Sequence, residues 1–246
     1  STTLFGQVAV PPFVPLTLAS GLQEPTTMEF LDHNDYLVLE QHSGKVIRIQ
    51  LPGPVVTTVL QLGTTTGSEE GMLGIARHPD FANNHWIYLY YTSTERNRNE
   101  IARYRWGGSR FISRDFIVSF PKNSRHNGGI ITFGPDGKLY AVVGDTLRSS
   151  KTTNNVNSPL LSVAQIVRLN DDGSIPADNP FSEPGWESTF AYGVRNSFGI
   201  TFDPISGHLW DTENGEAGYD EVNRVVAGMN SGWSRIMGPL ARSSGN

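Results

Sequence analysis

His126 is the histidine of this sequence that is best placed for chemistry. It lies in the segment RHNGG, just before the pair Gly128 and Gly129 at the expected start of a strand and separated from that pair by Asn127. The glycines allow a tight turn there and leave the imidazole room to face a substrate. A neutral imidazole can take a proton from a substrate hydroxyl near neutral pH, as a general base does. The alternative is a histidine that caps a turn by hydrogen bonding to the backbone.

Arg195 and Asn196 form a second candidate group, in the segment GVRNSFG. A permanent cation beside an amide suits a carbonyl or oxyanion that gains charge during a reaction. The alternative is an arginine that bridges two structural units and takes no part in chemistry.

The segment DTENGEAGYDE, residues 211–221, gathers acidic side chains around two glycines. Carboxylates and exposed loop carbonyls are the hard oxygen ligands that calcium prefers. The spacing does not fit the EF-hand pattern, so a solvated acidic loop is the alternative interpretation.

The composition indicates many short strands joined by tight turns. Glycine and proline contribute 26 and 15 residues, well above average usage, and helical periodicity is scarce. The formal net charge of −5 offers no basic surface for nucleic acid or an anionic membrane. No apolar run approaches the length of a membrane span, so we expect neither partner. The absence of cysteine excludes disulfides and thiolate metal sites.

One unit recurs four times along the chain, with insertions. Each copy is a strand, a turn, a second apolar strand, a polar connection and a further strand. Repeats of this kind, roughly 50 to 70 residues long, are typical of propeller blades. The second strands centre near Tyr36, Ile87, Leu139 and Leu209. We therefore expect a single all-β propeller domain over residues 1–246, with four-stranded antiparallel blades at about 17–60, 61–122, 123–190 and 191–246.

Polar connections of successive blades gather at one end of a propeller's central channel. Residues that are distant in sequence can therefore converge there. The candidate segments are 67–74, 125–129, 193–199 and 211–221.

Six blocks of the sequence resemble, in order, the soluble glucose and sorbosone dehydrogenases. These are aldose sugar dehydrogenases that use pyrroloquinoline quinone on a six-bladed propeller. A single block such as GPDGKLY is common to unrelated propellers, whereas six in the right order are specific. The blocks are GLQEPTTMEFL, EGMLGIARHPDF, HNGGIITFGPDGKLY, VRLNDDGSIPADNPF, YGVRNSFGITFDP and TENGEAGYDEVNRVVAGMNSGW.

The resemblance implies an oxidation of the anomeric carbon of an aldose sugar, with hydride passing to the quinone. His126 would be the base that removes the anomeric hydroxyl proton, and Arg195 would stabilise charge on the quinone oxygen. Further positions would bind the cofactor: Glu69, Asn196, Asn214 and Asp220. The backbone carbonyls of Gly215 and Glu216 would hold a calcium ion.

Among the positions that depart from the family's usual residues, two change a charge close to the expected base and cofactor; Glu216 in place of proline and GWS at 232–234 in place of GWP are further departures. Glu69 stands where glutamine is common, which places a like charge near the anionic cofactor. Arg125 stands where an acidic residue is common, which would remove the carboxylate that orients His126.

The chain resembles about two thirds of the family's propeller, so we expect four of six blades, completed by a further C-terminal segment. We also expect an external electron acceptor and a periplasmic or extracellular location. Two alternatives stay open. One is a non-catalytic propeller that binds a protein or glycan, and the other is a calcium-dependent lactonase on a similar propeller.

Overall fold

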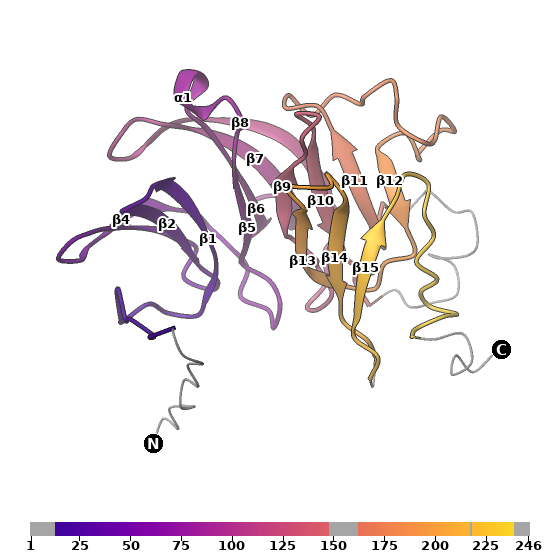
Figure 1. Ribbon diagram of the computed structural model, residues 1–246, viewed down its shortest axis with the longest axis horizontal. Coiled ribbons are helices and arrows are strands. Elements are labelled where there is room, and N and C mark those ends of the chain that lie inside the picture. The colour runs from indigo at the N-terminus through magenta and orange to yellow at the C-terminus, as the bar shows by residue number, and fades with distance from the viewer. Residues whose placement is uncertain (1–12, 148–161, 217, 239–246) are drawn as a thin grey trace.

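The computed structural model describes residues 13–147, 162–216 and 218–238, which form four antiparallel β-sheets. The sheets follow one another along the chain and lie side by side in an arc (Figure 1). We call them blades 1 to 4. In the described part of the chain the one α-helix is a single turn, α1 (Phe81–Asn84). The predicted all-β propeller is therefore confirmed, and this chain carries four of its blades.

Blades 1 and 2 are each four-stranded meanders in which every strand pairs with the next one along the chain. Alternating apolar and polar residues favour such half-buried strands, and short polar turns join them. Blade 1 contains β1 (Pro25–Asp32), β2 (Asp35–Glu40), β3 (Lys45–Gln50) and β4 (Val55–Gln61). Blade 2 contains β5 (Met72–Arg77), β6 (Trp86–Ser93), β7 (Arg98–Trp106) and β8 (Phe111–Phe120).

Blade 3 has the same order of strands, whereas blade 4 has three strands among the described residues. Blade 3 ends at Tyr192, just beyond the expected boundary at residue 190. Its strands are β9 (Ile131–Phe133), β10 (Leu139–Val143), β11 (Gln165–Leu169) and β12 (Thr189–Tyr192). Blade 4 contains β13 (Ser197–Phe202), β14 (Leu209–Glu213) and β15 (Glu221–Val225).

The second strand of each blade coincides with one of the four expected strand centres. β10 shows why these strands can be recognised in the sequence: all five of its residues are buried, so they form an unbroken apolar run. A continuous apolar run of this length is typical of a strand covered on both faces. In this fold the two faces are covered by the neighbouring blades.

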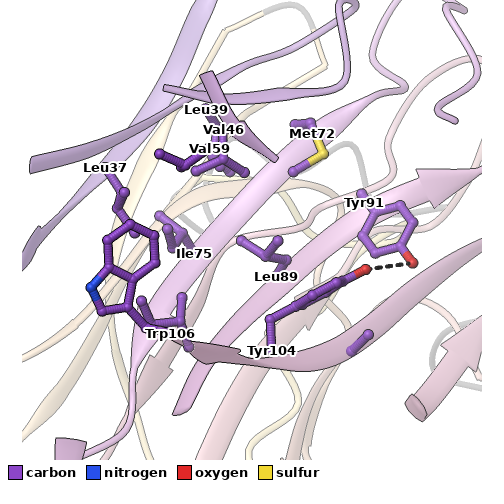
Figure 2. Packing of buried hydrophobic residues seen from close by; sticks show 12 residues of the cluster. Leu37, Leu39, Val46, Val59, Met72, Ile75, Leu89, Tyr91, Tyr104 and Trp106 are labelled. Atoms are coloured by element: carbon purple, nitrogen blue, oxygen red, sulfur yellow. Dashed lines mark hydrogen bonds between the residues drawn. The ribbon is translucent and has the colours of Figure 1, made fainter. Parts of the chain in front are cut away.

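Apolar side chains fill the space between neighbouring blades. Between blades 1 and 2, Leu37 and Leu39 of β2 share a core with Ile75 of β5 and Leu89 of β6 (Figure 2). Similar clusters join blade 2 to blade 3 and blade 3 to blade 4. Each fully buried aliphatic side chain contributes about 1.5–3 kcal/mol. These clusters therefore fix the angle between one blade and the next.

The first strands of neighbouring blades lie close together, and Gly74 marks the tightest approach. A Cβ atom at Gly74 of β5 would overlap with the carbonyl oxygen of Gly129, just before β9. Only glycine fits at this point. The segment that carries His126 is therefore held directly against blade 2.

Candidate active site

His126 lies in the segment that enters the β9–β10 hairpin, and Asp145 lies in the segment that leaves it. Because the two strands are antiparallel, the hairpin brings both residues to the same end of blade 3. The His126 Nδ1 lies 2.7 Å from Asp145 Oδ1, and both side chains are buried. A proton on Nδ1 facing this carboxylate leaves the lone pair on Nε2, where a base needs it. The geometry thus holds the imidazole in an orientation suited to accept a proton.

The expectation that His126 lacks an orienting carboxylate was wrong. Arg125 is exposed, and the carboxylate comes instead from Asp145, further along the chain. The signal was present in the sequence, because Asp145 directly follows the buried run LYAVVG. A carboxylate at the end of a buried strand is 0% exposed here and needs hydrogen-bond partners.

Glu69 joins His126 and Asn196, although the three residues precede the first strands of three different blades. Its Oε2 accepts hydrogen bonds from the His126 backbone N–H at 2.6 Å and from Asn196 Nδ2 at 3.1 Å. The Asn196 Oδ1 in turn accepts from the Gly128 backbone N–H at 3.0 Å. The structure therefore brings three of the predicted site residues together.

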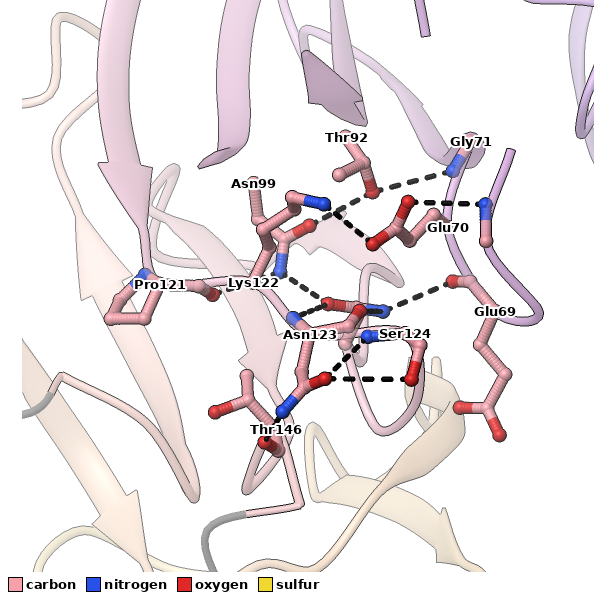
Figure 3. A network of polar contacts seen from close by, with 12 residues as sticks. Glu69, Glu70, Gly71, Thr92, Asn99, Pro121, Lys122, Asn123, Ser124 and Thr146 are labelled. Atoms are coloured by element: carbon pink, nitrogen blue, oxygen red, sulfur yellow. Dashed lines mark hydrogen bonds and ion pairs between the residues drawn. The ribbon is translucent and has the colours of Figure 1, made fainter. Parts of the chain in front are cut away.

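A network centred on the buried amide of Asn127 supports the His126 segment. Asn127 Oδ1 accepts from Asn99 Nδ2 and from the Asn123 backbone N–H, while its Nδ2 donates to the Asn123 carbonyl. Asn123 also donates to the carbonyl of Thr146, next to Asp145 (Figure 3). A satisfied polar network of this kind is rigid, so both ends of the hairpin are fixed.

Arg195 lies beside this group, held by blade 4. Its backbone N–H donates to Glu213 Oε1 at 2.6 Å, and its Nη1 donates to the Asn214 carbonyl at 3.0 Å. The guanidinium carbon lies 5.3 Å from the centre of the Trp233 ring. The buried Nε of Arg195 has no hydrogen-bond partner among the described residues. A buried donor without a partner suits an anionic or carbonyl acceptor supplied by a ligand.

Glu213 belongs to the acidic segment 211–221 that the sequence marks as a candidate, but the sequence assigns it no role of its own. It is 1% exposed, and burial raises its pKa to about 7, although hydrogen bonds from the Arg195 backbone and Ser231 lower it. Glu213 is the last residue of β14, the second strand of blade 4. Its role in the structure is to hold the backbone of Arg195.

The remaining predicted residues lie in the loop between β14 and β15. Asp220 is exposed and accepts a hydrogen bond from the Gly215 backbone N–H at 2.8 Å. Its carboxylate thus shapes the loop that carries Gly215 and Glu216. No group of three or more histidine or acidic side chains suited to a metal occurs in residues 13–147, 162–216 and 218–238. A calcium ion here would depend on backbone carbonyls, the role that the resemblance implies for Gly215 and Glu216.

A cavity of about 310 Å³ opens beside Glu69. Hydroxyl, amide and carboxylate groups from blades 1 and 2 share its wall with apolar side chains of the later blades. The cavity lies where the first strand of each blade begins, next to the segment that carries His126. The lining residues are Thr26, Thr27, Gln41, Ser68, Glu69, Leu73, Gly128, Ile130 and Phe198.

The fold and these contacts place the chain among β-propellers that assemble a polar site from the entry segments of successive blades. The particular family is shown by sequence: the chain belongs to the glucose/sorbosone dehydrogenase family, whose model matches residues 22–240. The chain is 30% identical over 90% of its length to quinoprotein glucose dehydrogenase B of Acinetobacter calcoaceticus. It is 31% identical over 88% of its length to aldose sugar dehydrogenase YliI of Escherichia coli.

The structure also resembles the PQQ-bound aldose sugar dehydrogenase of Streptomyces coelicolor. The TM-score is 0.84 and the identity 31%, over 95% of this chain and 69% of that one. The chain spans 52% of the Acinetobacter relative and 60% of the Escherichia relative. Within the described residues, no helix is long and apolar enough to cross a membrane.

Proposed function

We propose that this chain is part of an oxidoreductase that oxidises the anomeric carbon of aldose sugars with pyrroloquinoline quinone as the acceptor. The observation that carries this proposal is the His126–Asp145 pair, buried beside an arginine with an unused donor. The removal of a proton together with a hydride requires a base for the proton and a fixed positive charge nearby, and both lie at the same end of the propeller. The named relatives support the same class of reaction.

His126 acts as the base in this proposal. Its Nε2 accepts the proton of the anomeric hydroxyl while the hydrogen on the same carbon leaves with its electron pair. The sugar is thereby oxidised to the lactone. Asp145 stabilises the imidazolium that forms and keeps the ring in its reactive orientation. The substrate therefore loses one proton, which goes to His126, and one hydride, whose proton and two electrons the acceptor would take up.

Arg195 and Asn196 hold the acceptor side of the site. When bound, pyrroloquinoline quinone supplies the two-electron acceptor that no amino-acid side chain provides. The free Nε of Arg195 fits its anionic oxygens, and Asn196 has an Nδ2 hydrogen left beyond its bond to Glu69. Asn214 and Asp220 line the loop nearby. Calcium would be held by the carbonyls of Gly215 and Glu216, where it would act as a Lewis acid.

At Glu69 the chain departs from the residue usual in the family, because a carboxylate stands where glutamine is common. Its Oε2 already accepts two hydrogen bonds, so its charge is partly satisfied by this protein's own groups. Glu69 also lines the cavity, and a carboxylate there can accept a hydrogen bond from a ligand hydroxyl. A sugar fits this chemistry.

The alternatives have less support. A calcium lactonase needs several carboxylate or amide ligands that converge on one metal, and no three acidic or histidine side chains do so in the described ranges. A partner-binding propeller has no need of a buried histidine–aspartate pair with a neighbouring free arginine donor. We further propose an external electron acceptor and a periplasmic or extracellular location, as for the soluble enzymes that the sequence resembles.

The test is a dye-reduction assay on the full-length protein, reconstituted with quinone and calcium, against a panel of aldoses. We expect sugar-dependent turnover that falls by about 100-fold or more in His126→Ala. His78→Ala is the matched control, because His78 lies in a turn after β5 and contacts Asn84, away from this mouth. The proposal fails if no aldose is turned over, or if His126→Ala equals the wild type.

A further inference from the structure

Trp233 touches both halves of the site, although it lies beyond the last described strand. Its indole Nε1 donates a hydrogen bond to Asp145 Oδ2 at 2.8 Å. The face of the same ring lies under the guanidinium of Arg195. We propose that Trp233 is a positioning residue that sets the orientation of the His126–Asp145 pair and the place of the Arg195 cation at the same time. This inference deepens the proposed function and rests on it for its turnover measurements.

The hydrogen bonds to Asp145 show why the indole N–H matters. Asp145 Oδ1 accepts from His126 Nδ1 and from the Leu147 backbone N–H, at 2.7 and 2.9 Å. Trp233 donates to the other oxygen of this fully buried carboxylate. If the indole N–H were removed, Asp145 Oδ2 would be a buried, charged oxygen that has lost its hydrogen bond from Trp233. Burying a charged acceptor in this way costs free energy. The carboxylate would then turn toward other donors, and His126 would lose its fixed partner.

The ring face matters for a different reason. Within the described residues, the side chain of Arg195 makes one hydrogen bond, from Nη1 to the Asn214 carbonyl, and a single bond of this kind leaves the guanidinium free to rotate about it. The indole face restricts this rotation, and a cation over an aromatic ring is also attracted electrostatically. Packing therefore directs the free Nε of Arg195, and no carboxylate in the part of the chain that the structure describes forms an ion pair with its guanidinium. This preserves the positive charge for a ligand.

The backbone of Trp233 is anchored independently of its side chain. Its N–H donates to the Gly193 carbonyl at 3.1 Å, and the Ser231 N–H donates to the Tyr192 carbonyl at 2.8 Å. Trp233 is 4% exposed. Because these main-chain bonds do not involve the indole, a change of side chain at this position leaves the segment in place. Two variants can therefore separate the two contacts.

Trp233→Phe keeps an aromatic face for Arg195 and removes the N–H to Asp145. Trp233→Leu removes both. The matched control is Trp86→Phe, because Trp86 also lies under an arginine, Arg103, but in blade 2 outside this site. Thermal unfolding and circular dichroism of all three variants establish that they fold.

The first measurement needs no cofactor. Two-bond 1H–15N correlation spectra of the protein report which ring nitrogen of His126 carries the proton, with His126→Ala for assignment. We expect the Nδ1–H tautomer in the wild type and in Trp86→Phe, and a mixture of tautomers in Trp233→Phe. A His126 tautomer in Trp233→Phe that matches the wild type would overturn the link to Asp145.

The second measurement uses the reconstituted full-length protein. We expect kcat of Trp233→Phe to fall about 10- to 100-fold, with cofactor affinity unchanged. Trp233→Leu should also bind the quinone about 3- to 30-fold more weakly, because it lacks the ring face. Equal cofactor affinity in both variants would overturn the role toward Arg195. If the wild type turns over no sugar, the proposed function fails, and the tautomer measurement still decides whether Trp233 positions His126.

Discussion

Asp145 accepts a hydrogen bond from the ring of His126 across 2.7 Å, and the two residues are joined by nothing more than one β-hairpin. The strands of that hairpin bring the two side chains together, while Asn123 and Asn127 fix the segments on either side. The pair therefore follows from the local fold of blade 3. The contacts of Glu69 and Trp233 join it to the rest of the site.

We expect Asp145→Asn to reduce sugar oxidation by about 100-fold or more, because the amide no longer stabilises an imidazolium at His126. KM for the sugar should change little, since Asp145 is fully buried and does not reach the cavity. Steady-state kinetics of the reconstituted protein measure both. Asp115→Asn, which removes a half-exposed partner of Arg103 in blade 2, serves as the control. Full activity in Asp145→Asn would contradict the role of the pair.

Glu69→Gln should tighten binding of the anionic quinone by about tenfold, because one like charge is removed from the site. The glutamine Oε1 can still accept the bonds from His126 and Asn196, so the fold should be unaffected. Titration calorimetry measures the affinity. Glu69→Ala provides the contrast: it leaves both donors without this acceptor and should cost about 1–3 kcal/mol in unfolding free energy. An unchanged quinone affinity in Glu69→Gln would show that the charge of Glu69 does not act on the ligand.

Glu213 should make stability depend on pH. Burial raises its folded pKa to about 7 from an ordinary value of 4.5. In the window from about pH 4.5 to 7 the folded protein therefore holds a proton that the unfolded chain has released. The contribution is fully present below the window and is lost as pH rises through 7, by on the order of 3 kcal/mol.

Glu213→Gln should flatten this fall, as measured by urea denaturation of the apo protein at a series of pH values. A residual slope is expected from Asp211, because burial raises its pKa as well. Glu183→Gln, which changes an exposed carboxylate in blade 3, should keep the wild-type slope. A slope in Glu213→Gln as steep as that of the wild type would assign the dependence to other groups.

Gly144→Ala should damage the site through the backbone alone. A Cβ atom there would overlap with the His126 carbonyl and lie 2.9 Å from Asn196 Oδ1. We expect a loss of about 1–3 kcal/mol in unfolding free energy, typical of overpacking, together with a loss of turnover. Gly53→Ala is the control, since nothing lies within 4 Å of a Cβ atom at that turn and only backbone strain is added. Wild-type stability in Gly144→Ala would mean that the His126 segment can move aside.

The sequence predicts the strands well because each blade repeats one pattern. β10 shows this best, since its run of buried apolar residues lies between a turn and a Gly-Asp pair. The predicted convergence of residues 69, 126 and 196 also follows from the repeat, because each of them precedes the first strand of a blade. Periodicity and turn chemistry are local properties, so they can be read from one sequence.

The partners within the site are harder to predict, because they depend on packing between blades. The resemblance implies that the carboxylate for His126 comes from its immediate neighbour, position 125, whereas the hairpin supplies it from Asp145. Trp233 reaches Asp145 from the segment after β15, 88 residues away in sequence. The spacing of residues along the sequence does not predict a contact of this kind. The roles of Asp220, Gly215 and Glu216 toward a metal stay predictions.

Glu69, His126 and Asn196 enter the site from blades 2, 3 and 4, and the apolar clusters between blades set how those three entry points are spaced. A larger or smaller side chain in one of these clusters therefore changes the width of the mouth without touching a polar residue. Ile131 and Ile166, buried in two different clusters, are such positions. Substitutions in the apolar clusters between blades can thus change which substrate fits the proposed site, while the reacting groups stay the same.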